Sequence, residues 1–584
     1  MSARFEKRTP QLRLKLEGWR SRLVLVLLAG GFALLAGRAF YLQALNTSFL
    51  QAKGEARYAR TIELPASRGK VLDRNGHALA ISTVVESICA TPEELGEADE
   101  RDLAALARAL GMNAGEVRQK IARKDRQFVF LKRQISPEQA AKVMGLRVPG
   151  VFQQREFRRY YPAGEVMAHV VGFTGIEDNG QEGMELAAEA RLAGVPGSRK
   201  VIRDRRGRIV EDAESLRPPR DGEPVTLALD QRLQFLAHKE LKAAVEASRA
   251  RAGSLVILDA KTGEVLALVN QPDYNPNNRA AVTGRQTRNR SVTDLFEPGS
   301  TLKPFTVAAA LDAGVVKSTT LIDTAPMKIG GWTINDSHPM GTLSVAQVIA
   351  KSSNIGTARI QLAMSAERVG TLYRELGFGV APRTGFPGEA KGQLRPWEKW
   401  RPVEQATMSY GHGISVSLLQ VARAYTVFAN EGRLLPLSLL RQDSTPSDPA
   451  GASPPRGKPL FTPAATREVM RMMELATLDG GTAPRAQVPG YRVAGKTGTA
   501  HKPENGGYAE HKYVSSFVGL GPVSDPRLVV AVMLDEPQGV KYYGGDVGAP
   551  VFSTVMGQAL RLMGVAPDAP ATLNVLAPKE SDPS

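Results

Sequence analysis

Apolar residues gather in one uninterrupted segment near the amino terminus. The run Leu23–Gly37, LVLVLLAGGFALLAG, carries no charged side chain. It is short for a bilayer core of roughly 30 Å, but Ala39–Leu42 extends the apolar surface beyond Arg38, whose long side chain can reach the interface. No other segment of the sequence approaches this length. The pattern predicts a single transmembrane helix over residues 23–45.

The residues before this run predict its orientation. Residues 1–22 contain seven Lys and Arg side chains but only Glu6 and Glu17 as acids. Because basic flanks stay on the cytoplasmic side, we expect residues 1–22 in the cytoplasm and the chain beyond residue 45 outside the inner membrane. Two alternatives remain open: a buried core helix, and a cleaved signal peptide, for which Gly37–Ala39 is a poor cleavage signature.

From residue 46 to residue 220, short β-like runs alternate with turn signals. Gly69–Gly76 ends in the dipeptide Asn-Gly, which predicts a tight hairpin turn. The proline-bearing stretch Leu216–Gly222 predicts a linker. We expect an elongated, β-rich and non-catalytic domain. One helical segment, Ala98–Arg123, interrupts it, with apolar residues at helical spacing: Leu103, Leu106, Leu110 and Val117.

Residues 221–563 combine strands at both ends with helices between them. This order predicts an α+β domain, in which an antiparallel sheet with paired first and last strands is covered by a layer of helices. Residues 444–458 are expected to form a loop and residues 564–584 a disordered tail. The expected elements are strand Val225–Leu229, helix Leu233–Ala247, hairpin Ser254–Val269, helical segments Phe305–Ala313 and Val345–Met364, and hairpin Phe517–Leu534.

The composition limits which cross-links and which partners the chain can have. The 584 residues include one cysteine, Cys89, so no intrachain disulfide can form. The formal net charge of +16 indicates an anionic partner. Because no zinc-finger spacing, aromatic-basic run or basic helix stripe accompanies this charge, we expect no nucleic-acid binding. The basic surface is expected to face anionic lipid or cell-wall polymer.

The stretch FEPGSTLKPF, from residue 296 to residue 305, places Ser300 three residues before Lys303. Pro304 fits a helix only in its first turn, so the helix is expected to begin at about Gly299 or Ser300, with both side chains on one face. A lysine whose pKa is lowered by burial or by a neighbouring cation can take the proton of a serine hydroxyl. The pair therefore predicts a nucleophile and its base.

Two further short motifs follow. Ser352–Asn354 is the one S-x-N in the chain and comes after an apolar helical segment, where it could equally be a helix cap. Lys496–Thr499, KTGT, follows a strand-like run. Second copies of two of these patterns, S-x-x-K at Ser67–Lys70 and K-T-G at Lys261–Gly263, lie in strand-turn sequences and are interpreted as structural.

One competing motif overlaps the third of these sites. Gly490–Thr497 satisfies the P-loop pattern G-x-x-x-x-G-K-[ST]. A P-loop needs a buried strand before it and a helix after it, so that helix amides can hold phosphate. Neither flank predicts such an element, and we interpret the match as accidental.

In this order, S-x-x-K, S-x-N and K-T-G resemble the active-site set of penicillin-binding proteins and class A β-lactamases. RGKVLDRNGHALA (68–80), YPAGEVMAHVVGF (161–173) and GME (183–185) resemble the non-catalytic pedestal of class B penicillin-binding proteins. WTINDSHPMG, IAKSSNIG, VAGKTGTAHK and YYGGDVGAPVF resemble the septal, division-specific transpeptidases. Asn354 favours that type, since elongation relatives usually carry S-x-D. The resemblance runs from the anchor to about Gly564 and implies the penicillin-binding/β-lactamase-like transpeptidase fold.

The resemblance implies peptidoglycan D,D-transpeptidation through an acyl-enzyme. Ser300 would attack the D-Ala-D-Ala carbonyl of a stem peptide, and Lys303 would take its proton. Ser352, bridging towards Lys496, would protonate the leaving D-alanine, while Asn354 holds Lys303. The backbone N–H groups of Ser300 and Thr499 would stabilise the oxyanion. The implied substrate-binding residues are Thr497, Gly498 and Thr499, with an aromatic wall of Tyr513, Tyr542 and Tyr543.

Missing motifs limit the other enzyme classes. No glutamate between Asn354 and Lys496 has an asparagine four residues later, so the water-activating E-x-x-L-N of β-lactamases has no counterpart and β-lactams are expected to inhibit. G-x-S-x-G and H-E-x-x-H are also missing, and we expect neither a metal nor a cofactor. His412 is interpreted as a loop residue near the site.

The implied setting is the bacterial envelope. We expect a single-pass inner-membrane protein with a periplasmic catalytic domain, and the implied partners are membrane lipid, stem peptides and division proteins including a lipid-II glycosyltransferase. Two alternatives remain: an elongation-type or specialised class B transpeptidase, and an inactive scaffold or β-lactam sensor. The expected domains are 1–22 (tail), 23–45 (anchor), 46–220 (non-catalytic), 221–563 (transpeptidase) and 564–584 (disordered tail).

Overall fold

The computed structural model describes residues 17–45, 59–96, 98–122, 126, 128–203, 209–442, 457–504 and 506–569. The chain forms two compact units. One lies within Met1–Ala66, Ser87–Gln154 and Pro196–Arg220, and the other within Ser67–Glu86, Arg155–Val195 and Asp221–Ser584. Residues 1–16 of the predicted tail, most of the predicted loop 444–458, and residues 570–584 lie outside the described residues.

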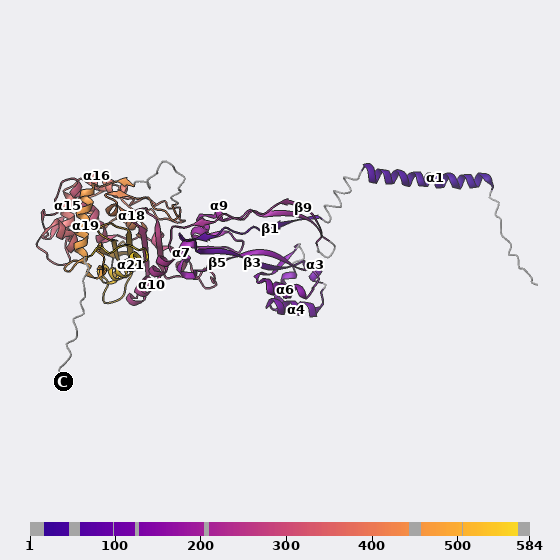
Figure 1. Ribbon diagram of the computed structural model, residues 1–584, viewed down its shortest axis with the longest axis horizontal. Helices are drawn as coiled ribbons and strands as arrows, with labels where there is room; N and C mark the ends of the chain where they lie inside the picture. Colours follow the sequence, from indigo (N-terminus) through magenta and orange to yellow (C-terminus); the bar gives the residue numbers. More distant parts are fainter. Residues whose placement is uncertain are drawn as a thin grey trace, which may run out of the picture. The chain divides into compact units, whose positions relative to one another are not determined.

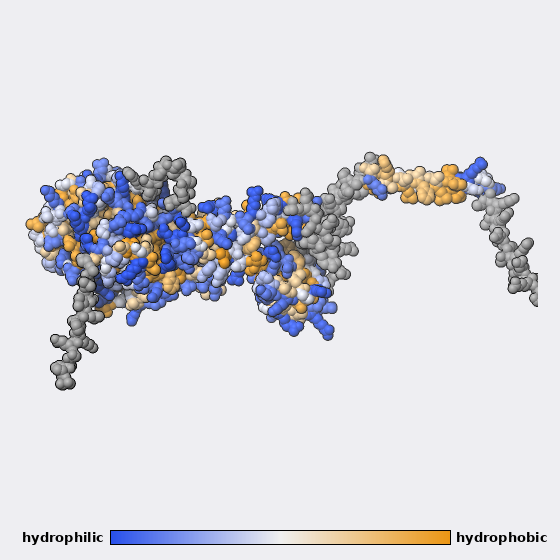
Figure 2. All heavy atoms as spheres, in the orientation of Figure 1, coloured by the Kyte–Doolittle hydropathy of each residue, from blue (hydrophilic) through white to orange (hydrophobic). Residues whose placement is uncertain are grey.

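Helix α1 (Gly18–Phe40), continued by the π-helical turn Tyr41–Leu45, contains the predicted membrane segment (Figure 1). None of its side chains is buried, and apolar residues surround most of its length (Figure 2). Within the described residues one helix, Gly18–Ala44, is long and apolar enough to cross a bilayer. The chain therefore carries a candidate single-pass anchor where the sequence predicts one.

Two helices contribute to the core of the first unit. The predicted apolar positions of α4 (Glu100–Leu110) and α5 (Ala114–Ile121) are all buried. A continuous helix over Ala98–Arg123 is wrong, because Gly111 adopts a left-handed conformation (φ 61°) that ends α4. The unit also contains α3 (Pro92–Leu95), β4 (Val129–Ile135), α6 (Pro137–Gly145) and the antiparallel sheet β1 (Ala59–Leu64), β8 (Gly197–Arg203) and β9 (Ile209–Arg217).

The stretch predicted as a linker has fixed structure at both ends. Leu216 and Arg217 are the last residues of β9. Gly222 donates its N–H to the carbonyl of Ser67 (2.9 Å), and a Cβ at this position would lie 1.8 Å from the carbonyl oxygen of Leu192. The boundary between the two units falls within this stretch, after Arg220, so the segment joins the units as a linker does, although its ends have fixed structure.

The second unit is built on a five-stranded antiparallel sheet in the order β12-β11-β21-β20-β19. The register places Val256 of β11 opposite Ala531 of β21, which confirms that the first and last strands pair. Both predicted hairpins are present. The strands are β11 (Ala252–Asp259), β12 (Val265–Gln271), β19 (Ala494–Glu504), β20 (Gly507–Gly521) and β21 (Leu528–Asp535).

Helices cover both faces of this sheet, not one as predicted. Leu255 and Ile257 of β11 pack into one core with α10 (Gln231–Ser248) and α21 (Ala549–Leu562). The alternating residues Val256 and Leu258 pack into a second core with three other helices, α13 (Lys303–Asp312), α18 (Leu418–Ala429) and α19 (Pro463–Thr477). A strand that is buried along its whole length requires cover on both sides.

Helices are the main regular elements of the chain between the hairpins, although loops and turns make up more of it than expected for a mostly helical chain. Short strand pairs interrupt it: β13 with β16 (Leu321–Asp323, Thr342–Ser344), β14 with β15 (Met327–Ile329, Trp332–Ile334) and β17 with β18 (Arg433–Leu434, Lys458–Pro459). The remaining helices are α11 (Gly284–Thr287), α12 (Arg290–Thr293), α14 (Val345–Lys351), α15 (Asn354–Leu362), α16 (Ala366–Glu375), α17 (Pro402–Met408) and α20 (Gly544–Val547).

Two of the phrases that resemble a pedestal domain, 68–80 and 183–185, meet at a buried ionic cluster in the second unit. Glu185 is fully buried and accepts hydrogen bonds from Arg68 Nε and Arg159 Nε, each at 2.6 Å. Paired burial avoids the cost of an isolated charge. Ser67–Lys70 thus lies at a structural junction, in keeping with its interpretation. The elements here are β2 (Val71–Leu72), β3 (Ala78–Ala90), β5 (Val151–Tyr160), α7 (Ala168–Val171), β6 (Phe173–Thr174), β7 (Gly180–Glu182), α8 (Gly183–Ala187), α9 (Glu189–Leu192) and β10 (Val225–Thr226).

The described start of the predicted disordered tail is attached to this unit. Val565 accepts a hydrogen bond from Tyr491 OH (2.7 Å), and Asp568 accepts one from the N–H of Arg492 (2.7 Å). Residues up to Ala569 therefore differ from the expectation, because Asp568 satisfies backbone donors of neighbouring loops.

Candidate active site

A cleft of about 640 Å³ lies where three separate parts of the second unit meet. It is lined by the 3₁₀ turn Gly299–Leu302, by the junction of α14 and α15, and by β19. The predicted lysines Lys303 and Lys496 are fully buried and contact residues of this cleft. Eight other predicted residues line it directly: Ser300, Ser352, Asn354, Thr497, Thr499, Tyr513, Tyr542 and Tyr543.

Ser300 lies in a 3₁₀ turn that leads straight into α13. Gly299 before it has a φ of 55°, a left-handed conformation that favours glycine. The α-helix itself begins at Lys303, with Pro304 in its first turn as the missing N–H requires. The predicted helix start is therefore early: the chain winds from Gly299, but as a tighter 3₁₀ turn.

Ser352 is the hydroxyl that contacts both amines. Its Oγ lies 3.2 Å from Lys303 Nζ and 2.9 Å from Lys496 Nζ. Ser300, the predicted nucleophile, lines the same cleft. Ser352 also ends α14 in a left-handed conformation (φ 62°, ψ 40°). A non-glycine residue held there stores strain of a kind that gathers at functional sites.

Burial sets the proton affinity of the two lysines. Desolvation, reinforced by the charge of Lys496, holds the pKa of Lys303 well below its usual value. Desolvation alone lowers the pKa of Lys496 to about 7. Lys303 Nζ donates to Asn354 Oδ1 (2.7 Å) and to the Ser352 carbonyl (2.5 Å). Burial thus favours a neutral Lys303, whereas Lys496 keeps its charge below a pH of about 7.

Asp336 holds the start of α15 and was not identified from the sequence, although it lies within the phrase WTINDSHPMG. Its Oδ1 accepts the N–H groups of Asn354 (2.5 Å) and Ile355 (3.1 Å), and its Oδ2 accepts the Ser353 hydroxyl (2.6 Å). A carboxylate at a helix N-terminus satisfies free amides and suits the helix dipole. Asp336 therefore fixes the backbone that carries Asn354.

Replacing Asp336 by asparagine is expected to lower the second-order rate constant for acylation by penicillin about 100-fold, because a small displacement of aligned groups costs rate steeply. With its oxygen on the two backbone N–H groups, the amide would turn an N–H group towards the Ser353 hydroxyl, which now donates to Oδ2, and the negative charge at the helix start would be lost. Asp323→Asn is the matched control, since Asp323 is exposed and pairs with Arg359 (3.2 Å). Equal rates for Asp336→Asn and Asp323→Asn would show that Asp336 does not position the site.

Strand β19 brings the K-T-G motif to the edge of the sheet. Gly498 has no room for a side chain, since a Cβ there would lie 2.4 Å from Ser516 Oγ and 2.9 Å from the Pro298 carbonyl. Thr499 Oγ1 accepts the N–H of Gly544 (3.1 Å). Strand β19 continues to Glu504, so Lys496 is followed directly by strand and not by the helix that a P-loop requires. The P-loop interpretation is therefore excluded. An edge strand in this place can pair with an extended peptide.

The predicted aromatic wall is assembled beside this strand. The rings of Tyr513 and Tyr542 stack at 4.2 Å, and those of Tyr542 and Tyr543 stack at 4.5 Å. All three side chains line the cleft. Stacked rings present a rigid apolar surface at little entropic cost.

His412 lines the cleft too, in agreement with its interpretation as a loop residue near the site. Its ring lies between those of Tyr410 (5.1 Å) and Tyr508 (5.8 Å). Burial lowers the pKa of His412 to about 4, so the imidazole is neutral at physiological pH. Tyr508, which the sequence analysis did not identify, thus joins the surroundings of the site.

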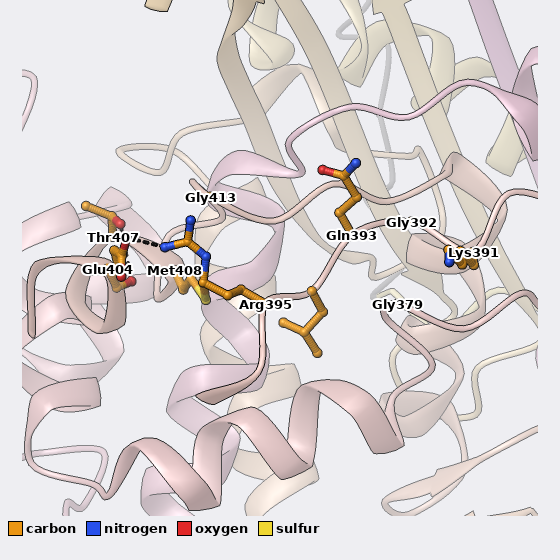
Figure 3. Close-up of a pocket in the computed structure, with 10 residues that line it drawn as sticks. Gly379, Lys391, Gly392, Gln393, Arg395, Glu404, Thr407, Met408 and Gly413 are labelled. Carbon is orange, nitrogen blue, oxygen red and sulfur yellow. Dashed lines mark hydrogen bonds and ion pairs between the residues drawn. The ribbon is translucent and has the colours of Figure 1, made fainter. Parts of the chain in front are cut away.

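A second cavity, of about 560 Å³, lies beside the loop that carries His412 (Figure 3). Met408 and Gly413, which bracket that loop, line it, and an Arg395–Glu404 ion pair spans one side. None of the predicted site residues lines this cavity. The described residues hold no group of three or more His, Cys, Asp or Glu side chains arranged to bind a metal.

Two family models match the chain. The penicillin binding protein transpeptidase domain covers residues 253–557, and the penicillin-binding protein dimerisation domain covers residues 63–227. The chain is 44% identical over 556 residues to the probable peptidoglycan D,D-transpeptidase PenA of Neisseria gonorrhoeae, across 95% of this chain and 94% of that protein. It is 39% identical over 559 residues to the peptidoglycan D,D-transpeptidase FtsI of Escherichia coli K12, across 95% and 93%.

Solved structures agree with these matches. The apo transpeptidase domain of penicillin-binding protein 3 from Burkholderia pseudomallei aligns with a TM-score of 0.54 and 46% identity, over 59% of this chain and 98% of that one. The predicted fold is confirmed: a transpeptidase domain follows a dimerisation domain and an apolar helix. The three motifs, their meeting in one cleft and these relatives together assign the chain to the class B penicillin-binding proteins.

Proposed function

We propose that this protein is a serine-type peptidoglycan D,D-transpeptidase that cross-links stem peptides at the division septum and is inhibited by β-lactams. One observation carries the proposal: the Ser352 hydroxyl lies within hydrogen-bonding distance of two buried lysine amines, in the cleft that Ser300 lines. The relatives support it, since both PenA and FtsI are named as peptidoglycan D,D-transpeptidases.

In the acylation step, the Ser300 hydroxyl attacks the carbonyl carbon of the D-Ala-D-Ala bond and gives its proton to the neutral amine of Lys303. The terminal carboxylate is held by Thr497 and Thr499, near the charge of Lys496. The carbon–nitrogen bond then breaks, and D-alanine leaves with a proton from the Ser352 hydroxyl. Lys303 returns its proton to Ser352, which the contact between Nζ and Oγ supports (3.2 Å).

In the transfer step, the amine of a second stem peptide attacks the acyl carbon, and its nitrogen–carbon bond replaces the ester bond to Ser300. The proton lost by the amine ends on the Ser300 hydroxyl through Lys303. The N–H groups of Ser300 and Thr499 stabilise the oxyanion in both steps, each contributing about 3 kcal/mol in comparable sites. A β-lactam follows only the first step, so the enzyme stays acylated.

The septal role rests on the S-x-N motif at Asn354 and on the name of the relative FtsI. The relative PenA, and PbpC of Pseudomonas aeruginosa at 40% identity, carry names that do not distinguish the roles. Helix α1 supports a single-pass anchor in the inner membrane, with residues 1–22 in the cytoplasm and the catalytic domain in the periplasm. The chain would then depend on a lipid-II glycosyltransferase and other division proteins as partners.

The activity is tested with the full-length chain in detergent, supplied with lipid II and a lipid-II glycosyltransferase. We expect cross-linked muropeptides and one released D-alanine per cross-link, both abolished by penicillin. Released D-alanine without cross-links would indicate a carboxypeptidase, and penicillin labelling without either product would indicate an inactive scaffold or sensor. Depletion in the source bacterium should give filaments without septa, whereas rounded cells would indicate an elongation enzyme.

A further inference from the structure

A smaller cavity, of about 290 Å³, lies next to the active-site cleft in the second unit. His501 lines both the cavity and the cleft, so the two spaces share this side chain as a wall. The cavity floor is formed by sheet residues, among them Ala500 of β19, Val514 of β20 and Met533 of β21. None of the residues assigned above to the donor peptide lines this cavity. It is therefore a separate space that adjoins the cleft at His501.

The charges of the cavity pair off with one exception. Arg290 pairs with Asp294 (2.8 Å), and Lys502 pairs with Asp535 (2.8 Å). Glu297, the fifth charged residue of the lining, takes part in no ion pair among the described residues. Glu297 is only 8% exposed. A buried carboxylate without a cation carries a desolvation cost that a cationic ligand would relieve.

The partners of Glu297 are neutral donors. Gly413 donates its N–H to Oε1 (2.8 Å), and the Tyr508 hydroxyl lies 3.1 Å from Oε1 and 3.0 Å from Oε2. These contacts orient the carboxylate but leave its charge unmatched, and burial raises the pKa of Glu297. Its two oxygens still have lone pairs that can accept a further hydrogen bond.

The position of Glu297 connects the cavity to the nucleophile. Glu297 precedes Ser300 by three residues, and Gly299 between them donates its N–H to Gly411 (3.4 Å) on the loop that also supplies Gly413. The carboxylate is thus held by the same loop that packs against the Ser300 turn. The rings of Tyr508 and His501, 6.5 Å apart, stand beside it and offer faces that attract a cation.

We propose that this cavity receives the amine-bearing side chain of the acceptor stem peptide, and that Glu297 holds its ammonium group. The proposal rests on the proposed transpeptidase function and names where its second substrate binds. The two ends of the site would then carry opposite charges. Lys496 attracts the terminal carboxylate of the donor peptide, whereas Glu297 attracts the ammonium group of the acceptor and repels the carboxylate of the donor. Charge alone would sort two peptides that are otherwise alike.

Glu297 acts here in binding and takes no part in bond making. The ammonium ion loses one proton to water before transfer, and the lone pair of the neutral amine then attacks the acyl carbon. The bond from that carbon to Ser300 Oγ breaks, and the second proton of the amine passes to Oγ through Lys303. Atoms and charges balance without any further reactant.

The test separates acylation from transfer. The donor is a thioester of an N-acylated D-alanine, so that thiol release reports acylation, and the acceptor is Nα-acetyl-lysine amide, whose single ammonium group is on its side chain. With the full-length chain, Glu297→Gln is expected to raise the acceptor concentration for half-maximal aminolysis about tenfold, as loss of a charge-assisted contact predicts. Glu297→Asp, which keeps the charge, should recover most of this affinity.

Glu375→Gln is the matched control, because Glu375, the last residue of α16, is exposed and pairs with Lys458 (2.9 Å). A half-saturating acceptor concentration for Glu297→Gln equal to that of Glu375→Gln overturns the proposal. Loss of thiol release from the unaltered chain would instead count against the transpeptidase function itself.

A second measurement avoids any doubt about the folding of variants. In the unaltered chain, Nα-acetyl-Nε-trimethyl-lysine amide, a permanent cation that cannot attack, should compete with the acceptor. The uncharged Nα-acetyl-norleucine amide at equal ionic strength should not. Equal competition by the two compounds would show that the acceptor is recognised by shape, not by charge, and would also overturn the proposal.

Discussion

Replacing Ser300 by alanine is expected to abolish covalent labelling by fluorescent penicillin and to lower transpeptidation at least about 10³-fold, as loss of a nucleophile does in other serine enzymes. The rival nucleophile is Ser352, whose hydroxyl is the one that contacts both amines. Ser300 is favoured because it lies in the turn that leads into α13, three residues before Lys303, and lines the cleft. Gel fluorescence and the mass of the penicilloyl peptide decide between them.

Two variants complete this comparison. Ser67→Ala removes the serine of the second S-x-x-K copy and should label like the unaltered chain, since Ser67 lies at a structural junction where its N–H donates to Asp221 (2.8 Å). Ser352→Ala should label slowly, because a proton carrier is lost while the nucleophile remains. Labelling that persists in Ser300→Ala and disappears in Ser352→Ala would exchange the roles of the two serines.

Local patterns were enough to predict the elements that carry the site. Pro304 placed Lys303 near a helix start, and the hairpin pattern at Ser254–Val269 predicted β11 and β12, because both depend on neighbours within a few residues. Periodicity could not predict the break at Gly111, since apolar spacing continues across it while the backbone turns left-handed there. Helical cover on both faces follows from burial, which alternation alone does not reveal.

The roles within the site depended on contacts that no local pattern contains. Tyr508 reaches Glu297 across 211 positions of sequence, and Asp336 reaches Asn354 across 18. Glu297 is part of the motif FEPGSTLKPF, but the sequence does not indicate that its carboxylate is buried without a cation. That property depends on the folded chain. The contacts of Ser352 with both lysines likewise join residues that lie 49 and 144 positions apart.

The rate constant for acylation by penicillin is expected to pass through a maximum near neutral pH and to fall about 100-fold by pH 9, as titration of a required cation predicts. Below the maximum, Lys303 binds a proton and cannot act as a base. Its pKa lies well below the usual lysine value because of burial and the charge of Lys496. Above the maximum, Lys496 loses its charge, since burial lowers its pKa to about 7, and the carboxylate of penicillin is no longer attracted.

Lys496→Arg tests which amine causes the falling limb. Arginine stays charged throughout this range, so the limb should disappear up to about pH 10 even if the larger side chain lowers the rate at every pH. Lys351→Arg is the control: Lys351 lines the same cleft but is exposed and donates to the Gly480 carbonyl (2.6 Å), so its variant should keep the falling limb. Stopped-flow acylation from pH 5 to 10 supplies the profiles.

A rate constant that stays level to pH 9 in the unaltered chain would mean that catalysis does not need a charged Lys496. A falling limb that persists in Lys496→Arg would show that another group in the cleft titrates. The carboxylate of penicillin would then be bound by the threonine hydroxyls of β19 alone.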